Sequence, residues 1–318
     1  MKLKLLERGF DDRLDMEGIR EVLILANERL GGCPFRCVGC GVHEEAEIVT
    51  PSKHSKIIKK QIANLSKKLN LHSKVYSKSG YHISVYNYGN ITNHRELSEK
   101  NFNLLLKEIN KLEPLPRHVS INSRGVFVSE NLLQKIKNKK LDYEIRFIIG
   151  IESLTPYGGK IYGKPGIAKE LRKMFSIIND FNKREGSSMG IDAGFVFLPE
   201  YYTKDRKNNK KILEGFLGDI REFISLYCGK KTPIKINLHP YYQVPNLSHK
   251  SAADKIHILI KAVKELQKDI GNINKKLPHK LHTSIFIGVN DTGYETPPWE
   301  EALSKWGNKI DQINKGKF

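Results

Sequence analysis

Residues Val22–Cys40 read VLILANERLGGCPFRCVGC, a predicted strand that leads into a loop holding three of the four cysteines in the chain. The apolar run Val22–Ala26 has the length and composition of a strand. The loop carries Cys33, Cys37 and Cys40 in a C-x3-C-x2-C spacing, behind two glycines that permit a tight backbone. Cysteines gathered this closely are typical of metal or redox chemistry rather than of a disulfide scaffold.

The rest of the chain alternates strand-length apolar runs with segments that have apolar residues at helical spacing. The expected strands are Val22–Ala26, His82–Tyr86, His118–Ile121, Ile145–Ile149, Ile191–Leu198 and Ile234–Leu238. The expected helices are 54–70, 98–112, 129–138, 167–184, 209–227 and 251–270. Ser98 and Ser129 precede two of these helices and are expected to cap them.

Six strand–helix units in succession predict an α/β fold with a parallel sheet covered by helices. Six units are too few for a closed eight-unit barrel, so we expect a partial (β/α)6 TIM-like barrel. A seventh strand, Thr283–Gly288, and a helix from about Pro298 to Asn314 predict a short C-terminal α/β extension. We expect a core over 1–240, including an N-terminal lead-in, and an extension over 241–318 that is not an independent domain.

The composition is that of a globular protein with a strong basic excess. Hydrophobic residues make up 39% of the 318 residues, and 54 Lys and Arg against 35 Asp and Glu give a formal charge of +19. No apolar run reaches the ~18 residues of a membrane span, and the N-terminus lacks a secretory signal, so we expect a cytoplasmic protein with no membrane partner. The charge indicates either a polyanionic partner or a lysine-rich solvated surface, and the second is favoured. The run Lys204–Lys211 is interpreted as a solvated loop entering a helix.

Three thiolates at the observed spacing can bind three irons of a [4Fe–4S] cluster and leave the fourth iron open, as a catalytic centre requires. Two other interpretations stay open. A zinc site would need a fourth ligand, which His43 could supply, and three structural cysteines could share the spacing by chance. Because only Cys228 is left over, we expect a single cluster, and we expect Cys228 to be inert core.

The cysteine spacing after the first strand of a six-unit partial barrel resembles that of the radical S-adenosylmethionine (radical SAM) superfamily. Four strand-end segments are similar to motifs of the branch that contains the radical domain of the elongator catalytic subunit and the archaeosine-type enzymes. These segments are Tyr86–Asn93, Ile121–Arg124, Gly150–Ser153 and Gly194–Pro199. Gly39 departs from the pattern, since an aromatic residue usually precedes the third cysteine, and Phe35 is expected to stack on adenine instead.

The resemblance implies a reaction and its cofactors. The amino and carboxylate groups of S-adenosylmethionine (SAM) would bind the open iron of one [4Fe–4S] cluster held by Cys33, Cys37 and Cys40. One electron would cleave the sulfonium bond, and the 5′-deoxyadenosyl radical would take a hydrogen atom from a substrate. An electron donor such as flavodoxin or ferredoxin is implied as a partner.

The resemblance also assigns cofactor-binding roles at the strand ends, where parallel barrels gather their active sites. Gly89 and Asn90 are expected to bind the methionyl amine, and Arg124 its carboxylate, a surface salt bridge being the alternative for Arg124. Glu152 is expected to accept from the ribose hydroxyls or the amine, unless it serves as the partner of a nearby Lys or Arg.

Three further residues are minor cofactor-binding candidates. Ser123 could contact SAM or act only in a turn. Phe195 and Val196 could offer backbone contacts to adenine or belong to the core.

The segment Asn237–Gln243 after the sixth strand collects polar, aromatic and titratable groups. We expect His239 and Tyr241 to act there as catalytic residues on the substrate side, with loop packing as the alternative. Asn290 and Asp291 are expected to close the same mouth. The favoured substrate is a small molecule (a sugar, nucleoside or amino acid). A tRNA base is the alternative, and a non-catalytic iron–sulfur protein is the third possibility.

Overall fold

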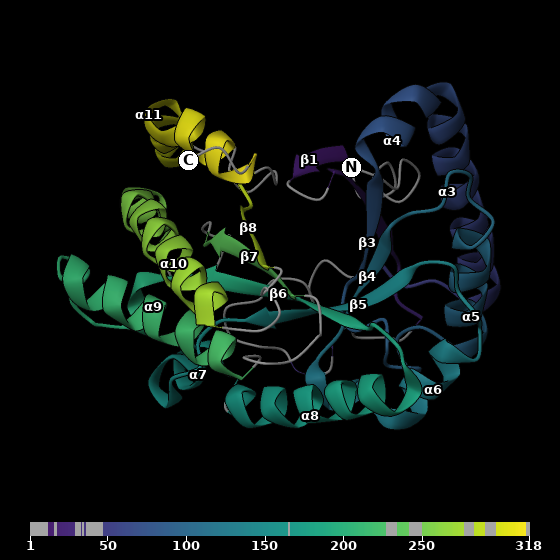
Figure 1. Cartoon of the computed structure of the whole chain (residues 1–318), viewed down its shortest axis with the longest axis horizontal. Coiled ribbons are helices and arrows are strands. Elements are labelled where there is room, and N and C mark those ends of the chain that lie inside the picture. Colours follow the sequence, from purple (N-terminus) through teal and green to yellow (C-terminus); the bar gives the residue numbers. More distant parts are fainter. Residues whose placement is uncertain are drawn as a thin grey trace. The chain divides into compact units, whose positions relative to one another are not determined.

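The computed structural model describes residues 12–15, 18–28, 33, 35, 47–164, 166–226, 234–241, 250–276, 283–289 and 297–315, in which strands and helices alternate (Figure 1). The strands are β1 (Asp12–Asp15), β2 (Gly18–Leu25), β3 (Tyr81–Asn87), β4 (His118–Asn122), β5 (Glu144–Ile151), β6 (Gly190–Phe197), β7 (Ile234–Pro240) and β8 (Thr283–Ile287). The helices are α3 (Pro51–Leu71), α4 (Ser73–Ser79), α5 (Glu99–Ile109), α6 (Glu130–Lys137), α7 (Pro156–Tyr162), α8 (Ile167–Glu185), α9 (Asn209–Ser225), α10 (Ile256–Lys276) and α11 (Pro297–Asn314).

The strands form one sheet in sequence order, from β1 to β8. β1 pairs antiparallel with β2, whereas β2–β3, β3–β4, β4–β5 and β7–β8 pair in parallel. The fold is therefore the predicted α/β partial TIM-like barrel with a short C-terminal α/β extension. The antiparallel strand β1 was not predicted.

The chain divides into two compact units. The first unit comprises Met1–Arg36, Gly41–Ile149 and Asp180–Ile191. The second unit comprises Cys37–Cys40, Gly150–Asn179 and Asp192–Phe318. The expected boundary at residue 240 stays a prediction. In the part of the chain that the structure describes, no helix is both long and apolar enough to cross a membrane.

Local sequence signals account for most helix boundaries. The hydroxyl of Ser98 accepts from the backbone N–H of Asn101 at 3.4 Å, and that of Ser129 from Leu132 at 3.3 Å, so both predicted N-caps are confirmed. The run Lys204–Lys211 does lead through an exposed loop into α9. Periodicity missed α4 and α7, each only seven residues long, because so short a helix shows too little of the 3.6-residue repeat.

The strands of the first unit bury an apolar face. Ile83, Val85, Val119, Ile121 and Phe147 come from β3, β4 and β5 and are completely buried. They share one face, since successive side chains of a strand alternate and the parallel register sets Ile83 beside Val119 and Ile121 beside Phe147. The residues between them point to the opposite face.

Candidate functional site

Cys33 is the one predicted cluster ligand within the described residues, and Cys37 and Cys40 lie outside them. The Cys33 side chain is half-buried and forms no disulfide, and its Sγ accepts a hydrogen bond from Nδ2 of Asn90 at 3.8 Å. The contact joins the segment after β2 to the turn after β3. An amide N–H directed at sulfur suits a cluster thiolate, because such hydrogen bonds stabilise the negative sulfur and tune its cluster. The described residues alone contain no group of three His, Cys, Asp or Glu that could hold a metal.

Glu96, which sequence reasoning missed, organises the turn after β3. Its buried carboxylate accepts from the backbone N–H of Asn90 at 2.7 Å, from Nδ2 of Asn90 at 3.2 Å and from Nδ2 of Asn93 at 2.7 Å. The backbone carbonyl of Glu96 accepts from Glu28 N–H at 2.9 Å. Glu96 and Cys33 engage Nδ2 of Asn90, which leaves its Oδ1 as an acceptor that receives no hydrogen bond from the described residues.

Gly89 is required at its position for a steric reason. A Cβ atom there would overlap Oε2 of Glu96, the oxygen that holds the neighbouring Asn90 N–H. The Gly89 carbonyl accepts from Nδ2 of Asn122 at 2.6 Å, and its N–H donates to Oδ1 of Asn87 at 3.2 Å. Side chains at the ends of β3 and β4 thus fix the backbone of the predicted cofactor-binding turn.

The structure also brings Arg124 and Phe35 together. The guanidinium carbon of Arg124 lies 3.8 Å from the centroid of the Phe35 ring, and Phe127 meets that ring edge-on at 5.9 Å. The contact is a cation–π interaction, which orients both groups. Ser123 is tied to its turn, since its Oγ lies 2.5 Å from Oγ1 of Thr92 and donates to the Arg124 carbonyl at 2.9 Å.

In the second unit, Glu152 pairs with a neighbouring lysine. Nζ of Lys164 lies 3.0 and 3.2 Å from the two carboxylate oxygens and donates to the carbonyl of Gly150 at 2.7 Å. Both side chains are buried. The alternative role foreseen for Glu152, the partner of a lysine, is therefore present. Its cofactor role stays a prediction.

The other strand-end candidates of the second unit have packing partners. Ser153 donates to Asp219 at 2.8 Å, and burial raises the pKa of that Asp219 carboxyl although the hydrogen bond opposes the shift. The Phe195 ring is buried edge-on against Phe223 at 5.3 Å, as a core residue would be. Val196 is half-buried. Backbone contacts of Phe195 and Val196 to adenine stay predictions.

The expected substrate-side residues lie at the end of β7. His239 is half-buried, and Tyr241 is buried with its N–H donating to the Phe197 carbonyl at 3.0 Å. Their catalytic roles stay predictions. His43, Cys228, Tyr242, Gln243, Asn290 and Asp291 lie outside the described residues.

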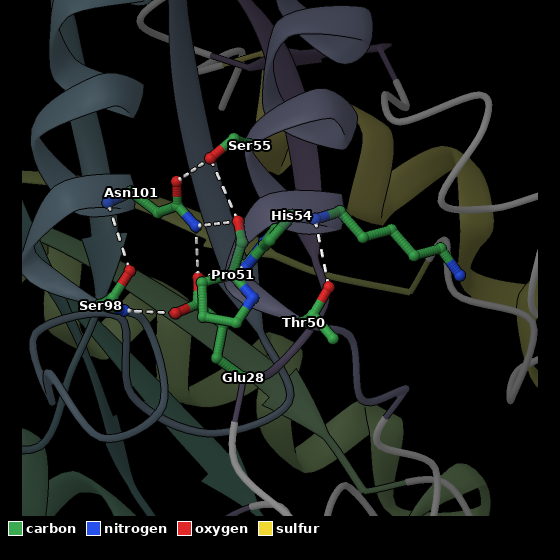
Figure 2. A network of polar contacts seen from close by, with 8 residues as sticks. Glu28, Thr50, Pro51, His54, Ser55, Ser98 and Asn101 are labelled. Carbon is green, nitrogen blue, oxygen red and sulfur yellow. Dashed lines mark hydrogen bonds and ion pairs between the residues drawn. The ribbon is translucent and has the colours of Figure 1, made fainter.

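A buried polar network fixes the end of β2 to α3 and α5 (Figure 2). The Glu28 carboxylate receives hydrogen bonds from Nδ1 of His54 at 2.9 Å, Nδ2 of Asn101 at 2.6 Å and the Ser98 N–H at 2.9 Å. Burial raises the pKa of Glu28, but these donors outweigh it and lower the pKa to about 2. Glu28 therefore anchors, as an anion, the segment that continues to Cys33.

A second feature that sequence reasoning missed is the polar face of β2–β5. Glu21 accepts from Lys68 of α3 at 2.9 Å and also from Tyr76 of α4, so its side chain faces the helices. Arg20 consequently points to the other face, where Nε donates to Oγ of Ser84 at 2.9 Å and Nη2 to the Tyr86 hydroxyl at 2.5 Å.

The strand register extends this polar face across the first unit. Its buried polar members are Arg20, His82, Ser84, His118, Ser120 and Arg146. The His82 and His118 rings stack with their centroids 4.5 Å apart. Strands of a parallel sheet covered on both sides are usually apolar on both faces, so this alternation was a signal available in the sequence.

No protein-family model matches the chain, and no curated protein matches it. Among solved structures, the chain is similar to a radical SAM methyltransferase from Sphaerobacter thermophilus (8% identity, TM-score 0.48, covering 84% of this chain and 66% of that one). It is also similar to anSMEcpe with bound AdoMet and the Cp18Cys peptide (13% identity, TM-score 0.47, covering 83% of this chain and 63% of that one). A third similar structure is HydG, a maturase of the [FeFe]-hydrogenase (13% identity, TM-score 0.45, covering 90% of this chain and 55% of that one). The chain thus spans less than two thirds of each of these structures. With TM-scores below 0.5, these likenesses carry no weight in assigning a function.

Proposed function

We propose that the chain is a radical SAM enzyme that abstracts a hydrogen atom from a small-molecule substrate, a sugar, nucleoside or amino acid. The observation that carries the proposal is the Cys33 thiol, which belongs to a C-x3-C-x2-C motif and faces the amide of Asn90 beside the ends of β2 and β3. The residues fit a cluster, since Cys33, Cys37 and Cys40 would supply thiolates and Asn90 supports one sulfur. When bound, the cluster supplies the electron that cleaves the sulfonium bond of SAM.

The protein side of the reaction is binding and orientation. Oδ1 of Asn90 and the Gly89 carbonyl would accept from the methionyl ammonium, while Glu96 holds both in place. Arg124 would bind the carboxylate, and the face of the Phe35 ring away from Arg124 would stack on adenine.

The remaining predicted residues complete the proposal. Glu152 would reach the ribose while Lys164 balances its charge, with Ser123, Phe195 and Val196 in supporting contacts. His239 and Tyr241 would contact the substrate.

Anaerobic reconstitution tests the proposal. The expected protein carries iron and sulfide near ~4 each per chain, and makes 5′-deoxyadenosine when given SAM and a reductant such as reduced flavodoxin. Replacing Cys33, Cys37 and Cys40 together by Ala should abolish both. Zinc near one per chain without iron would refute the proposal. A stable cluster with no SAM cleavage would favour a non-catalytic iron–sulfur protein instead.

One observation favours a second candidate function, the modification of a tRNA base. A groove of about 1040 Å³ lies on the helices α3 and α5, which run side by side in the first unit (Figure 1). Its basic lining consists of Lys56, Lys59, Lys100, Lys107, Lys111 and Lys139. Lys111 pairs with Glu108 at 2.7 Å, and the other five make no ion pair with any described residue.

The lining chemistry fits phosphates better than a protein partner. Protein interfaces are depleted in Lys and enriched in Arg and aromatic residues, and the groove lining contains neither of the latter. Lysines instead act as point charges for phosphates, and the lack of aromatic platforms indicates contact with the backbone rather than with bases.

Salt-dependent binding of bulk tRNA tests this second candidate. Changing Lys56, Lys59, Lys100 and Lys107 to Gln should make the slope of log K against log salt shallower by ~3. The matched control changes Lys204, Lys207, Lys210 and Lys211 to Gln, which removes the same charge from the loop before α9 and its first turn. Equal losses in both variants, or binding of flavodoxin but not of tRNA, would reject the groove as an RNA site.

A further inference from the structure

Arg20 is a buried cation whose hydrogen-bond partners among the described residues are neutral. It is 5% exposed, and its described contacts are the hydroxyls of Ser84 and Tyr86 and the Tyr86 ring, whose centroid lies 5.8 Å from the guanidinium carbon. Buried arginines are ordinarily paired with an acid, because removing a charge from water costs much more than neutral hydrogen bonds return.

Two nearby acids of the first unit, Glu21 and Glu144, are already engaged. Glu21, next in sequence, faces the helices and binds Lys68 and Tyr76. Glu144 of β5 pairs with Arg146 at 2.6 Å. Among the residues whose side chains the structure describes, no carboxylate lies within ion-pair distance of Arg20.

The three side chains together present only donors. An arginine has five N–H groups and no acceptor. The hydroxyls of Ser84 and Tyr86 both accept from Arg20, so each directs its own O–H hydrogen elsewhere. Two such O–H groups, beside a guanidinium that no described carboxylate neutralises, are the complement of an anion with several acceptor oxygens.

The position of the trio suits a substrate. Tyr86 is the penultimate residue of β3 and is half-buried, whereas Arg20 and Ser84 are buried. It begins the segment Tyr86–Asn93 whose Asn90 contacts Cys33. The trio lies on the polar face of β2–β5, together with the stacked pair His82 and His118.

We propose that Arg20, Ser84 and Tyr86 form a subsite for an anionic group, a carboxylate or a phosphate, carried by the substrate. The inference rests on the proposed function and narrows its substrate to an acidic small molecule, such as an amino acid, a sugar phosphate or a nucleotide. Arg20 neutralises the anion, and the two hydroxyls fix its orientation.

Anion binding to the reconstituted holoprotein tests the subsite without turnover. Inorganic phosphate and acetate are titrated by calorimetry in a chloride-free buffer, with wild type, Arg20→Gln, Arg20→Lys and Tyr86→Phe. Loss of a charge-assisted hydrogen bond predicts roughly ten- to a hundredfold weaker binding for Arg20→Gln. Tyr86→Phe should weaken binding by about fivefold, and Arg20→Lys should retain more affinity than Gln. Arg172→Gln, which removes the same charge from an exposed pair with Glu222, is the control and should bind as wild type.

Several outcomes would overturn the subsite. Wild-type affinity in Arg20→Gln is one, and no anion binding by the wild type is another. If Arg20→Gln does not fold, an unchanged affinity in Tyr86→Phe overturns it equally. A parallel titration with SAM separates the anion sources, because a loss of SAM affinity matching the loss for phosphate would assign Arg20 to the SAM carboxylate and not to the substrate.

The same preparations keep this inference distinct from the proposed function. Cluster content and substrate-free 5′-deoxyadenosine formation are measured on the wild type and on the Arg172→Gln control, in which both should be unchanged. A wild type that holds a cluster and cleaves SAM, while Arg20→Gln binds phosphate normally, refutes the subsite alone. A wild type without a cluster refutes the proposed function, whatever the anion titration shows.

Discussion

The overlap between a residue-89 side chain and the Glu96 carboxylate predicts a specific energetic coupling. Gly89→Ala would place a Cβ on Oε2 of Glu96 and displace the oxygen that holds the Asn90 N–H. Overpacking a tight site costs ~1–3 kcal/mol, and a buried donor left without its acceptor costs ~1–3 kcal/mol more. We therefore expect Gly89→Ala to lower the free energy of unfolding by about 3 kcal/mol.

Glu96→Ala should cost a similar amount for a different reason. It removes the acceptor of three hydrogen bonds, from Asn90 N–H, Asn90 Nδ2 and Asn93 Nδ2. The expected loss is about 4 kcal/mol. In the double variant the new methyl group no longer meets a carboxylate, so the total should stay near 4 rather than reach about 7 kcal/mol.

Urea unfolding of the four proteins gives this double-mutant cycle directly. The predicted coupling energy, about 3 kcal/mol, is well above the deviation from additivity that independent sites show, about 0.5 kcal/mol. Additive losses would refute the steric reasoning and with it the claim that Glu96 fixes the turn. Gly218→Ala, at a helical glycine whose added Cβ meets nothing within 4 Å, is the control and should be neutral or slightly stabilising.

Three further predictions concern pH and the proposed reaction. Because the folded pKa of Glu28 is lowered from 4.5 to about 2, its contribution to stability is complete above pH 4.5 and is lost as pH falls toward 2. Glu28→Gln should reduce the fall in melting temperature between pH 4.5 and about 2. If the melting temperature of the variant falls with pH as steeply as that of the wild type, Glu28 is not the group responsible. Arg124→Ala and Glu152→Ala should keep the cluster but weaken SAM binding roughly ten- to a hundredfold, measured by calorimetry, and wild-type affinity would remove either residue from the SAM site. His239→Ala should leave slow, substrate-free SAM cleavage intact and abolish its acceleration by substrate, so loss of the substrate-free reaction would place His239 on the cofactor side.

The polar face of β2–β5 shows how a local signal can be present and still be missed. His82 and Ser84 in β3, and His118 and Ser120 in β4, follow the period of two that a half-polar strand requires. The apolar run was read from Val22 onward, whereas β2 begins at Gly18, so Arg20 was left outside the expected strand. Strand boundaries depend on pairing with neighbours, and local composition does not contain that information.

Glu96 and Glu152 illustrate what no local pattern contains. The carboxylate of Glu96 acts on a backbone N–H six residues away, and its carbonyl receives the N–H of Glu28 from a different strand end. Glu152 was open to two roles, and the fold places Lys164 against it across the intervening helix α7. The three-dimensional path of the chain determines which residues become such partners.

By itself, the sequence determined the order and type of the major elements, the fold class and the cysteine motif. Hydrophobic periodicity, capping residues and ligand spacing are local properties, readable over a few residues. Only the tertiary structure decided that Asn90 faces Cys33, that Glu96 holds Asn90, and that Arg20 is buried against the hydroxyls of Ser84 and Tyr86. The contacts of Cys33 and Arg20 join residues that β pairing brings together, up to 66 positions apart along the chain, and the contact of Glu96 depends on the fold of the turn after β3.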